Sequence, residues 1–382
     1  MTLNNENKIH TLEPAYIPKN KMIFLIDWLI TLKCNYNCNY CPIGTEGHDN
    51  SKPHPKKDVC LKMLQQMYRY VDIIMEYKNP RFKDAVLNIY GGEALYHPNI
   101  EEILIESSQL YKDYIKKWNL KRTMTTNASA QLKTWKIICE HIESFTLSYH
   151  SQSPEKMKIV FKNNIEYLLK IKKEYDIVVL MYPHKKYWED CVEFINFCQK
   201  NKLNFRPRLL DGPLGLYNQD QLNFLETFYQ NKKSQINLKN VLPNKEILSQ
   251  GRSCCGGRSL CLNRNLKTHE EFVPRSLGFE GWHCSANWFF LMANTDTKSF
   301  FTNKDCKVTL YGTKGPISNI ETMDDYIDKM KILLKENKLP VMKCVQKTCI
   351  CGSCAPKSMQ KENLYDIMKI YNTTSGVKNF LN

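Results

Sequence analysis

The chain has no apolar run long enough to span a membrane. Its most hydrophobic early stretch, residues 22–32, is shorter than the roughly 20 residues that a spanning helix needs, and it contains Asp27. No basic segment followed by an apolar core and a small-residue cleavage site occurs near the start, so we expect no secretory signal. There is also no low-complexity tract and no internal repeat beyond a βα alternation, which argues against solenoid architectures.

Arginine is scarce in an otherwise basic chain. Only nine of the 54 basic residues are arginines, while the formal net charge is +15. That charge is compatible with a nucleic-acid partner, but a solvated lysine-rich surface is the favoured explanation, so nucleic acid is only weakly supported. Six arginines lie between residues 206 and 275, where they could bind a substrate phosphate or carboxylate, or pair with local carboxylates. The candidate substrate ligands are Arg208, Arg252 and Arg258.

Cysteine, in contrast, is abundant, with 16 in 382 residues. A secreted chain would use so many cysteines for disulfides, but without a secretory signal we expect metal binding in a reducing cytoplasm. The hydrophobic content of 42% and charged content of 24% are those of an ordinary globular protein. The length allows one large domain and a smaller appendage.

Three of these cysteines form the run Cys34-Asn-Tyr-Asn-Cys38-Asn-Tyr-Cys41. A [4Fe–4S] cluster has four irons, and each takes one thiolate when the protein supplies all the ligands. A loop with three cysteines leaves one iron open, as catalytic zinc sites leave one position open for chemistry. A zinc knuckle is the alternative, but zinc usually closes with four ligands and no second Cys-x2-Cys pair lies near this run.

This spacing resembles the motif of the radical S-adenosylmethionine (radical SAM) superfamily, Cys-x3-Cys-x2-Cys with an aromatic residue, here Tyr40, before the last cysteine. The resemblance implies that the open iron chelates the amino and carboxylate groups of S-adenosyl-L-methionine. Reductive cleavage then releases a 5′-deoxyadenosyl radical, which abstracts a hydrogen atom from a substrate carbon. It also implies an electron donor such as flavodoxin or ferredoxin, and a cytoplasmic location that protects oxygen-labile clusters.

The region from residue 22 to 214 alternates between short apolar runs and longer segments with a 3.6-residue period, which predicts βα units. Six parallel strands joined by right-handed helical crossovers predict an α/β fold, a partial (β/α)6 barrel. The predicted strands are 24–32, 85–90, 122–126, 145–149, 177–182 and 205–210. The expected divisions are an N-terminal arm over 1–21, the barrel over 22–214, a helical connector over 215–253 and a small cysteine-rich auxiliary-cluster domain over 254–382.

Several candidate site residues end predicted strands, where functional groups of parallel α/β folds gather. Gly91-Gly92-Glu93 resembles the superfamily's Gly-Gly-Glu segment, in which the backbone and the glutamate receive the amine of the cofactor. The glycines would allow close backbone approach to that ligand. Asn127, Ser148 and His150 are candidates for the ribose and carboxylate of the cofactor, although His150 also fits a residue packed in the barrel rim.

The last part of the chain holds most of the remaining cysteines. Cys284 and Cys306 bracket a predicted strand–turn–strand, and Cys351-Gly-Ser-Cys354 supplies a later pair. This resembles the twitch and SPASM extensions of the superfamily, which imply at least one auxiliary [4Fe–4S] cluster. The spacing departs from the full SPASM pattern, which leaves a second cluster open, and zinc is the alternative metal. The candidate ligands are Cys261, Cys284, Cys306, Cys344, Cys349, Cys351 and Cys354.

The segment Cys254-Cys255-Gly-Gly-Arg258-Ser-Leu-Cys261 has two open interpretations. It could supply cluster ligands, or Cys254 or Cys255 could return a hydrogen atom to a substrate radical. The glycines beside Arg258 suit close contact with a phosphate or carboxylate. Four other cysteines lie singly on predicted helices and are expected to be buried small hydrophobes. These are Cys60, Cys139, Cys191 and Cys198.

The predicted function is therefore that of a radical SAM enzyme. The arginine cluster favours a small anionic metabolite, sugar or nucleotide as substrate, undergoing epimerisation, dehydrogenation or rearrangement. Modification of a peptide or protein is the alternative, and modification of RNA or DNA rests on the net charge alone. An iron–sulfur scaffold or electron carrier is the non-enzymatic alternative.

Overall fold

The structure is a computed structural model. It describes residues 11–12, 23–41, 50, 53–76, 84–210, 217–231, 280–284, 286–288, 290–302, 315–336, 341–345 and 357–358. The predictions for several residues lie outside these ranges. They are Arg252, Cys254, Cys255, Arg258, Cys261, Cys306, Cys349, Cys351 and Cys354.

Six consecutive parallel strands form the main body of the central sheet, and they stand in sequence order. Because every neighbouring pair is parallel, each of the five connections must cross back over the sheet. Each of them contains at least one helix. This confirms the predicted α/β partial barrel. The strands are β2 (Ile23–Leu29), β3 (Asp84–Tyr90), β4 (Lys121–Thr126), β5 (Ser144–His150), β6 (Glu174–Met181) and β7 (Phe205–Leu209).

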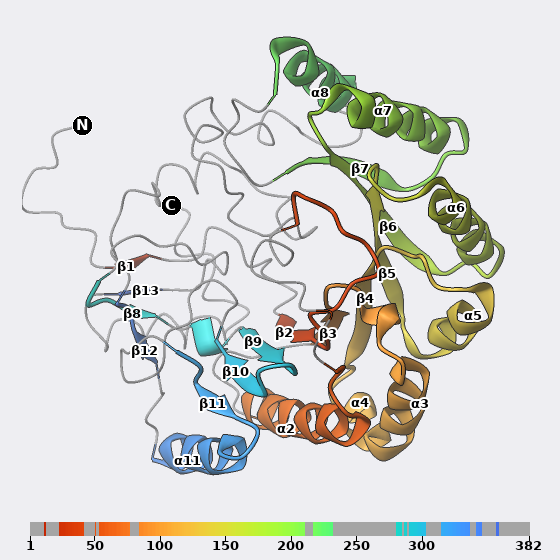
Figure 1. The fold of residues 1–382 in the computed structure, drawn as a ribbon. Helices are drawn as coiled ribbons and strands as arrows, with labels where there is room; N and C mark the ends of the chain where they lie inside the picture. Colours follow the sequence, from red (N-terminus) through yellow and green to blue (C-terminus); the bar gives the residue numbers. More distant parts are fainter. Residues whose placement is uncertain are drawn as a thin grey trace, which may run out of the picture.

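The helices lie along the outer, convex side of this curved sheet (Figure 1). A short 3-10 helix, η1 (Ala94–Tyr96), follows β3. The last helix of this layer lies within residues 215–253, where the sequence predicts a helical connector. The helices are α2 (Lys57–Glu76), α3 (Ile100–Leu110), α4 (Lys112–Lys117), α5 (Leu132–His141), α6 (Glu155–Lys170), α7 (Lys185–Lys200) and α8 (Gln219–Asn231). Among the described helices, none has the length and apolar character that crossing a membrane requires.

The core lies between the sheet and this helical layer. In β3 the outward residues Ala85, Leu87 and Ile89 are fully buried, while the alternate residues are half-buried. The Tyr149 ring of β5 stacks on Phe194 of α7 with 3.7 Å between ring centroids. Burial of such side chains is the main stabilising term of the fold. The isolated cysteines are buried in this layer, as predicted: Cys60, Cys139, Cys191 and Cys198.

The C-terminal part of the chain adds three strands to the same sheet. β9 (Phe290–Asn294) pairs parallel with β2, and β10 (Ser299–Phe301) and β11 (Ser318–Asn319) continue antiparallel, so the described sheet has nine strands. The β9–β10 hairpin confirms the predicted strand–turn–strand. Its pairing with β2 was not predicted, because no local pattern encodes contacts between segments so distant in the sequence.

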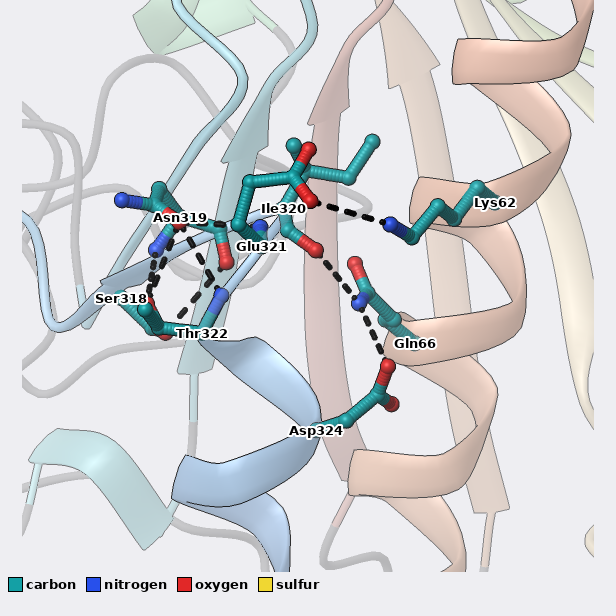
Figure 2. Close-up of polar contacts among 8 residues, drawn as sticks. All are labelled: Lys62, Gln66, Ser318, Asn319, Ile320, Glu321, Thr322 and Asp324. Atoms are coloured by element: carbon teal, nitrogen blue, oxygen red, sulfur yellow. Dashed lines mark hydrogen bonds and ion pairs between the residues drawn. The ribbon is translucent and has the colours of Figure 1, made fainter.

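Polar contacts hold α11 (Met323–Lys335) and the two residues Ile320 and Glu321 that precede it against α2 (Figure 2). Gln66 is 1% exposed and donates from Nε2 to the carbonyl of Ile320 at 2.9 Å and to Asp324 at 3.0 Å. Lys62 and Glu321 form an ion pair at the exposed margin, with 3.6 Å between Nζ and Oε2. The barrel and the C-terminal segment are therefore joined through a buried side chain as well as through the sheet.

A second, smaller sheet has four short strands in the order β1-β13-β8-β12, all antiparallel. The predicted N-terminal arm contributes one of them. These strands bring together residues from both ends of the chain and from the cysteine-rich region. They are β1 (Thr11–Leu12), β8 (His283–Cys284), β12 (Met342–Lys343) and β13 (Lys357–Ser358).

Candidate functional site

The cysteine loop begins where β2 ends, and the loop after β3 runs beside it. Gly92 donates its backbone N–H to the carbonyl of Thr31 at 2.8 Å, and Glu93 donates to the carbonyl of Lys33 at 2.8 Å. Because these bonds replace further strand pairing, β2 ends at Leu29, three residues before the predicted end. The two loops therefore form one unit at the carboxyl edge of the sheet.

The two glycines are required by this close packing. A Cβ added at Gly91 would lie 2.4 Å from the carbonyl oxygen of Thr31. One added at Gly92 would lie 2.4 Å from the carbonyl oxygen of Lys33 and 2.5 Å from that of Leu32. Both clashes are with backbone, which cannot rotate away. The structure thus gives these glycines a packing role next to the cysteine loop, in addition to the ligand contact that the sequence predicts.

Glu93 ties the ends of β3 and β4 together. Its side chain is 2% exposed, and Oε1 accepts from the Leu95 N–H at 2.9 Å and the Thr126 hydroxyl at 2.7 Å. Oε2 accepts from the Asn127 N–H at 2.6 Å. Burial raises the pKa of Glu93, while these three donors act in the opposite direction. Its contact with the cofactor amine stays a prediction, and in the structure its carboxylate organises the loops.

Asn127 extends this support to the cysteine loop. Its Nδ2 donates to Oδ1 of Asn35 at 2.9 Å, and Asn35 in turn donates to the Ser129 hydroxyl at 2.8 Å. The sequence analysis placed Asn127 at the site but missed Asn35. Nothing in the sequence distinguishes Asn35 from the other asparagines of the loop, because its role depends on the loop after β4.

The three cysteines of the loop are free thiols, with Cys38 buried and the other two half-buried. The Tyr36 N–H donates to Sγ of Cys34 at 3.3 Å. Burial raises the pKa of Cys34 to about 12 and that of Cys38 to about 11. For Cys34 this pKa value includes a lowering by the Tyr36 N–H and smaller increases from the negative charges of Glu93, Cys38 and Cys41. Burial raises the pKa of Cys60, Cys139 and Cys191 in the same way, so it is the grouping of three thiols in one loop that fits a metal or cluster, whose charge would favour the thiolates.

Within the described part of the chain, no group of three His, Cys, Asp or Glu side chains could hold a single metal ion. The three thiols of the cysteine loop are present at the carboxyl edge of the sheet, and their binding of a cluster stays a prediction.

His150, the last residue of β5, lies against the cysteine loop. Its Nδ1 is 2.9 Å from the Tyr40 hydroxyl and 3.5 Å from Sγ of Cys38. The Tyr40 ring is parallel to the imidazole, and the Tyr36 ring meets it edge-on with 5.7 Å between centroids. Burial lowers the pKa of His150 to about 4, which keeps the ring neutral. Ser148, two residues earlier, lies on the same half-buried face of β5.

The inward face of the barrel carries polar side chains among apolar ones such as Val86, Val178 and Leu180. Asp27 of β2 is 7% exposed and accepts from Nδ2 of Asn88 on β3 at 3.1 Å. Thr125 of β4 donates to Oδ1 of Asn88 at 3.2 Å. At the other end of the sheet, Nε of Arg206 on β7 is 2.7 Å from Oδ2 of Asp176 on β6. The barrel interior therefore offers hydrogen-bonding groups and charges of both signs.

The Arg206–Asp176 ion pair bears on the arginine cluster of the sequence. Arg206 pairs with a local carboxylate, which is one of the two interpretations that the sequence left open. Arg208 follows it on the same half-buried face, one residue from the carboxyl end of β7. Its role as a substrate ligand stays a prediction.

The turn of the β9–β10 hairpin reaches the start of the cysteine loop. Asp296 accepts from the backbone N–H of Leu32 at 2.7 Å, and Thr295 accepts from the Trp28 indole at 2.8 Å. The sequence analysis recognised this segment only as a polar turn. Its contact with the cysteine loop follows from the parallel pairing of β9 with β2, which has no local signature.

Two predicted auxiliary ligands come together in the small sheet. Cys284 on β8 lies opposite Met342 on β12, and the Cys344 N–H donates to the carbonyl of Trp282 at 2.7 Å. Cys284 and Cys344 are therefore diagonal neighbours on one face of the sheet. Both are buried, at 3% and 7% exposure. On the other side of β8, Lys357 of β13 lies opposite Cys284.

No family model and no curated protein matches this chain. Among solved structures, it is similar to anSMEcpe with bound AdoMet, with 16% identity, a TM-score of 0.48 and coverage of 80% of this chain and 79% of that chain. The same protein with bound AdoMet and the Cp18Cys peptide gives 16% identity, a TM-score of 0.47 and the same coverage, 80% and 79%. Coproporphyrinogen III oxidase (HemN) from Escherichia coli, described as a radical SAM enzyme, gives 10% identity, a TM-score of 0.35 and coverage of 58% and 54%.

Proposed function

We propose that this chain is a radical SAM enzyme in which Cys34, Cys38 and Cys41 hold a [4Fe–4S] cluster with one open iron. The observation that carries the proposal is the placement of the three-thiol loop. It lies at the carboxyl edge of a parallel sheet, and the loops after β3 and β4 hold it there through buried hydrogen bonds. Burial raises the pKa values of Cys34 and Cys38, so a bound cation would be needed to turn these two thiols into thiolates at neutral pH.

When bound, the cluster and S-adenosyl-L-methionine supply one-electron cleavage and a radical that abstracts hydrogen, which no side chain can supply. The chain's own residues position this chemistry. Gly91 and Gly92 let the two loops approach, and Glu93 and Asn127 fix the loop geometry through buried bonds. The barrel wall shields the site from water and unwanted hydrogen donors.

The polar side chains of the inward face support a polar substrate. Asp27 and Asn88 present a carboxylate and an amide on one side, and Arg208 stands near the carboxyl end of β7 on the other. A guanidinium in that place is suited to a phosphate or carboxylate. We therefore retain a small anionic metabolite, sugar or nucleotide as the proposed substrate class, with peptides as the class to be tested beside it.

We further propose that Cys284 and Cys344 are ligands of an auxiliary cluster at the small sheet. Two buried thiols on one face of a sheet are half of the four thiolates that a closed cube needs. The remaining ligands would come from the other candidate cysteines near the C-terminus. Metal analysis distinguishes this from zinc, because a cube binds iron and sulfide in equal amounts.

The test of the main proposal is anaerobic reconstitution of the full chain with iron and sulfide, followed by dithionite and S-adenosyl-L-methionine. We expect 5′-deoxyadenosine to accumulate, and we expect none from the variant Cys34→Ala/Cys38→Ala/Cys41→Ala. A cluster that forms without any cofactor cleavage would instead support an electron carrier. Deuterium transfer from labelled metabolites, nucleotides or peptides into 5′-deoxyadenosine would then identify the substrate class.

A further inference from the structure

One histidine stands beside a cysteine of the loop. Nδ1 of His150 is 3.5 Å from Sγ of Cys38, within the range of an N–H···S hydrogen bond, and 2.9 Å from the Tyr40 hydroxyl. The ring is held from two sides, by the parallel Tyr40 ring and by the edge-on Tyr36 ring. His150 is also the final residue of β5, so its backbone is fixed by the strand. The position of Nδ1 is therefore set by its surroundings.

The protonation of Cys38 decides which atom donates. A free thiol carries a hydrogen and can donate to a bare Nδ1. A thiolate that ligates iron has no hydrogen and can only accept, so a lone pair on Nδ1 would repel it. A stable contact in the metal-bound state requires the hydrogen to be on Nδ1, and the neutral ring has one N–H that can take this position.

We propose that His150 is a positioning residue that donates a hydrogen bond from Nδ1 to Sγ of Cys38 and makes the cluster easier to reduce. With the hydrogen on Nδ1, the Tyr40 hydroxyl cannot donate to this nitrogen; its oxygen accepts there, and its own hydrogen is directed at Sγ of Cys38. This inference rests on the proposed function, because it requires a cluster on Cys38. It gives His150 a role distinct from contact with the ribose or carboxylate of the cofactor.

The direction of the effect follows from charge. Reduction adds an electron to the cluster, and part of the added negative charge resides on the thiolate sulfurs. A donor directed at one sulfur stabilises the reduced state more than the oxidised state and raises the reduction potential. The Tyr36 N–H acts on Cys34 in the same sense, at 3.3 Å. Loss of the His150 donor therefore makes the potential more negative.

The experiment is a potentiometric titration of reconstituted full-length protein, followed by EPR of the signal that changes when S-adenosyl-L-methionine is added. His150→Phe keeps a ring without a donor, and His150→Asn keeps an N–H close to the place of Nδ1. His184→Phe is the matched control, because the ring contacts of His184 are with Tyr182 and Tyr187. Tyr40→Phe removes the hydroxyl while preserving the ring. Iron content and thermal unfolding are measured for each variant.

We expect the midpoint potential of His150→Phe to shift to more negative values at unchanged iron content. His150→Asn should restore most of the shift, Tyr40→Phe should show a smaller shift, and His184→Phe should show none. Equal potentials for wild type and His150→Phe would overturn the inference, as would an equal shift in His150→Phe and His150→Asn. If wild type formed no cofactor-sensitive cluster, the proposed function itself would fail, which separates the two outcomes. If His150→Phe does not fold, His150→Leu, which also lacks a donor, takes its place in each of these comparisons.

Discussion

The cysteine loop gathers three thiols within residues 34–41, whereas Cys284 and Cys344 reach one face of a small sheet from separate strands. The loop is supported by side chains from neighbouring strand ends, above all Glu93 and Asn127. The described contacts of the small sheet are mainly backbone pairings. Three ligands from one short loop, held by neighbouring side chains, are suited to a metal site that must keep one coordination position open. A site closed by four ligands from distant segments is suited to holding the chain together.

The largest expected difference between the regions concerns Cys38→Ala. Removal of one thiolate from a three-ligand site leaves two irons without protein ligands, so we expect loss of about four iron atoms per chain and no 5′-deoxyadenosine. Iron analysis and chromatography of the reaction products measure both. Substantial cofactor cleavage by this variant would contradict the assignment.

Two glycines, one beside the cysteine loop and one next to the small sheet, test whether backbone packing differs between the two regions. The Cβ of Gly92→Ala would lie 2.4 Å from the carbonyl of Lys33, and we expect a cost of about 3 kcal/mol because neither backbone can move freely. Gly281, next to the small sheet, has a φ of +84° and nothing within 4 Å of an added Cβ. Gly281→Ala should cost only about 1 kcal/mol, from the positive φ alone. Urea unfolding measures both, and equal costs would contradict the packing role of Gly92.

Cys284→Ala tests whether the second region acts independently. We expect loss of the auxiliary cluster, about four iron atoms per chain, with the cofactor-sensitive EPR signal of the cysteine loop retained. Cys344→Ala should give the same result, because both thiols lie on one face of the sheet. The matched control is Cys139→Ala, which removes a buried thiol from the helical layer and should leave the iron content unchanged. Loss of the cofactor-sensitive signal in Cys284→Ala would show that the regions are not independent.

The stability of the protein should be sensitive to acid through His54, which contacts Thr31 at the start of the cysteine loop. Burial, together with smaller contributions from the positive charges of His97 and Lys33, lowers the pKa of His54 to about 4. A histidine whose folded pKa is depressed contributes stability above its unfolded pKa of about 6.5, and this contribution is lost as the pH falls toward 4. We expect the melting temperature to fall between pH 6.5 and 4, and to fall less in His54→Gln. An identical pH dependence in the variant would refute this prediction.

The smallest effect is expected far from both regions. Lys172 has a φ of +55° at the end of α6, where glycine is the preferred residue. Lys172→Gly should stabilise the protein by about 1 kcal/mol and leave the iron content unchanged. Glu166→Gly, at an exposed position inside α6, should instead destabilise it by about 1 kcal/mol. Urea unfolding measures whether each variant is more or less stable than the wild type. Destabilisation by Lys172→Gly would show that the lysine side chain stabilises the fold by more than its backbone strain costs.

The alternation of apolar runs and helical periods was enough to predict all six barrel strands in their order. The sequence also placed Glu93, Asn127 and His150 at the carboxyl edge, because strand ends can be read from local pattern. The end of β2 could not be predicted, since Thr31 and Lys33 bond to the loop after β3 instead of extending the strand.

Contacts that depend on tertiary pairing were also beyond the sequence. Asp296 reaches the cysteine loop only because β9 pairs with β2. Asn35 is recognisable only once Asn127 lies beside it. The shared face of Cys284 and Cys344 follows from the register of two strands of two residues each, which are too short to carry a periodic signal.

The central claim is that one iron at the cysteine loop is open and receives the cofactor. The most direct measurement is electron–nuclear double resonance on the reduced, reconstituted protein with S-adenosyl-L-methionine labelled with ¹⁵N at the amine and ¹⁷O at the carboxylate. We predict hyperfine coupling to both labels, and its absence in Cys34→Ala/Cys38→Ala/Cys41→Ala. A cluster signal on the loop that showed no coupling to either label would contradict the account.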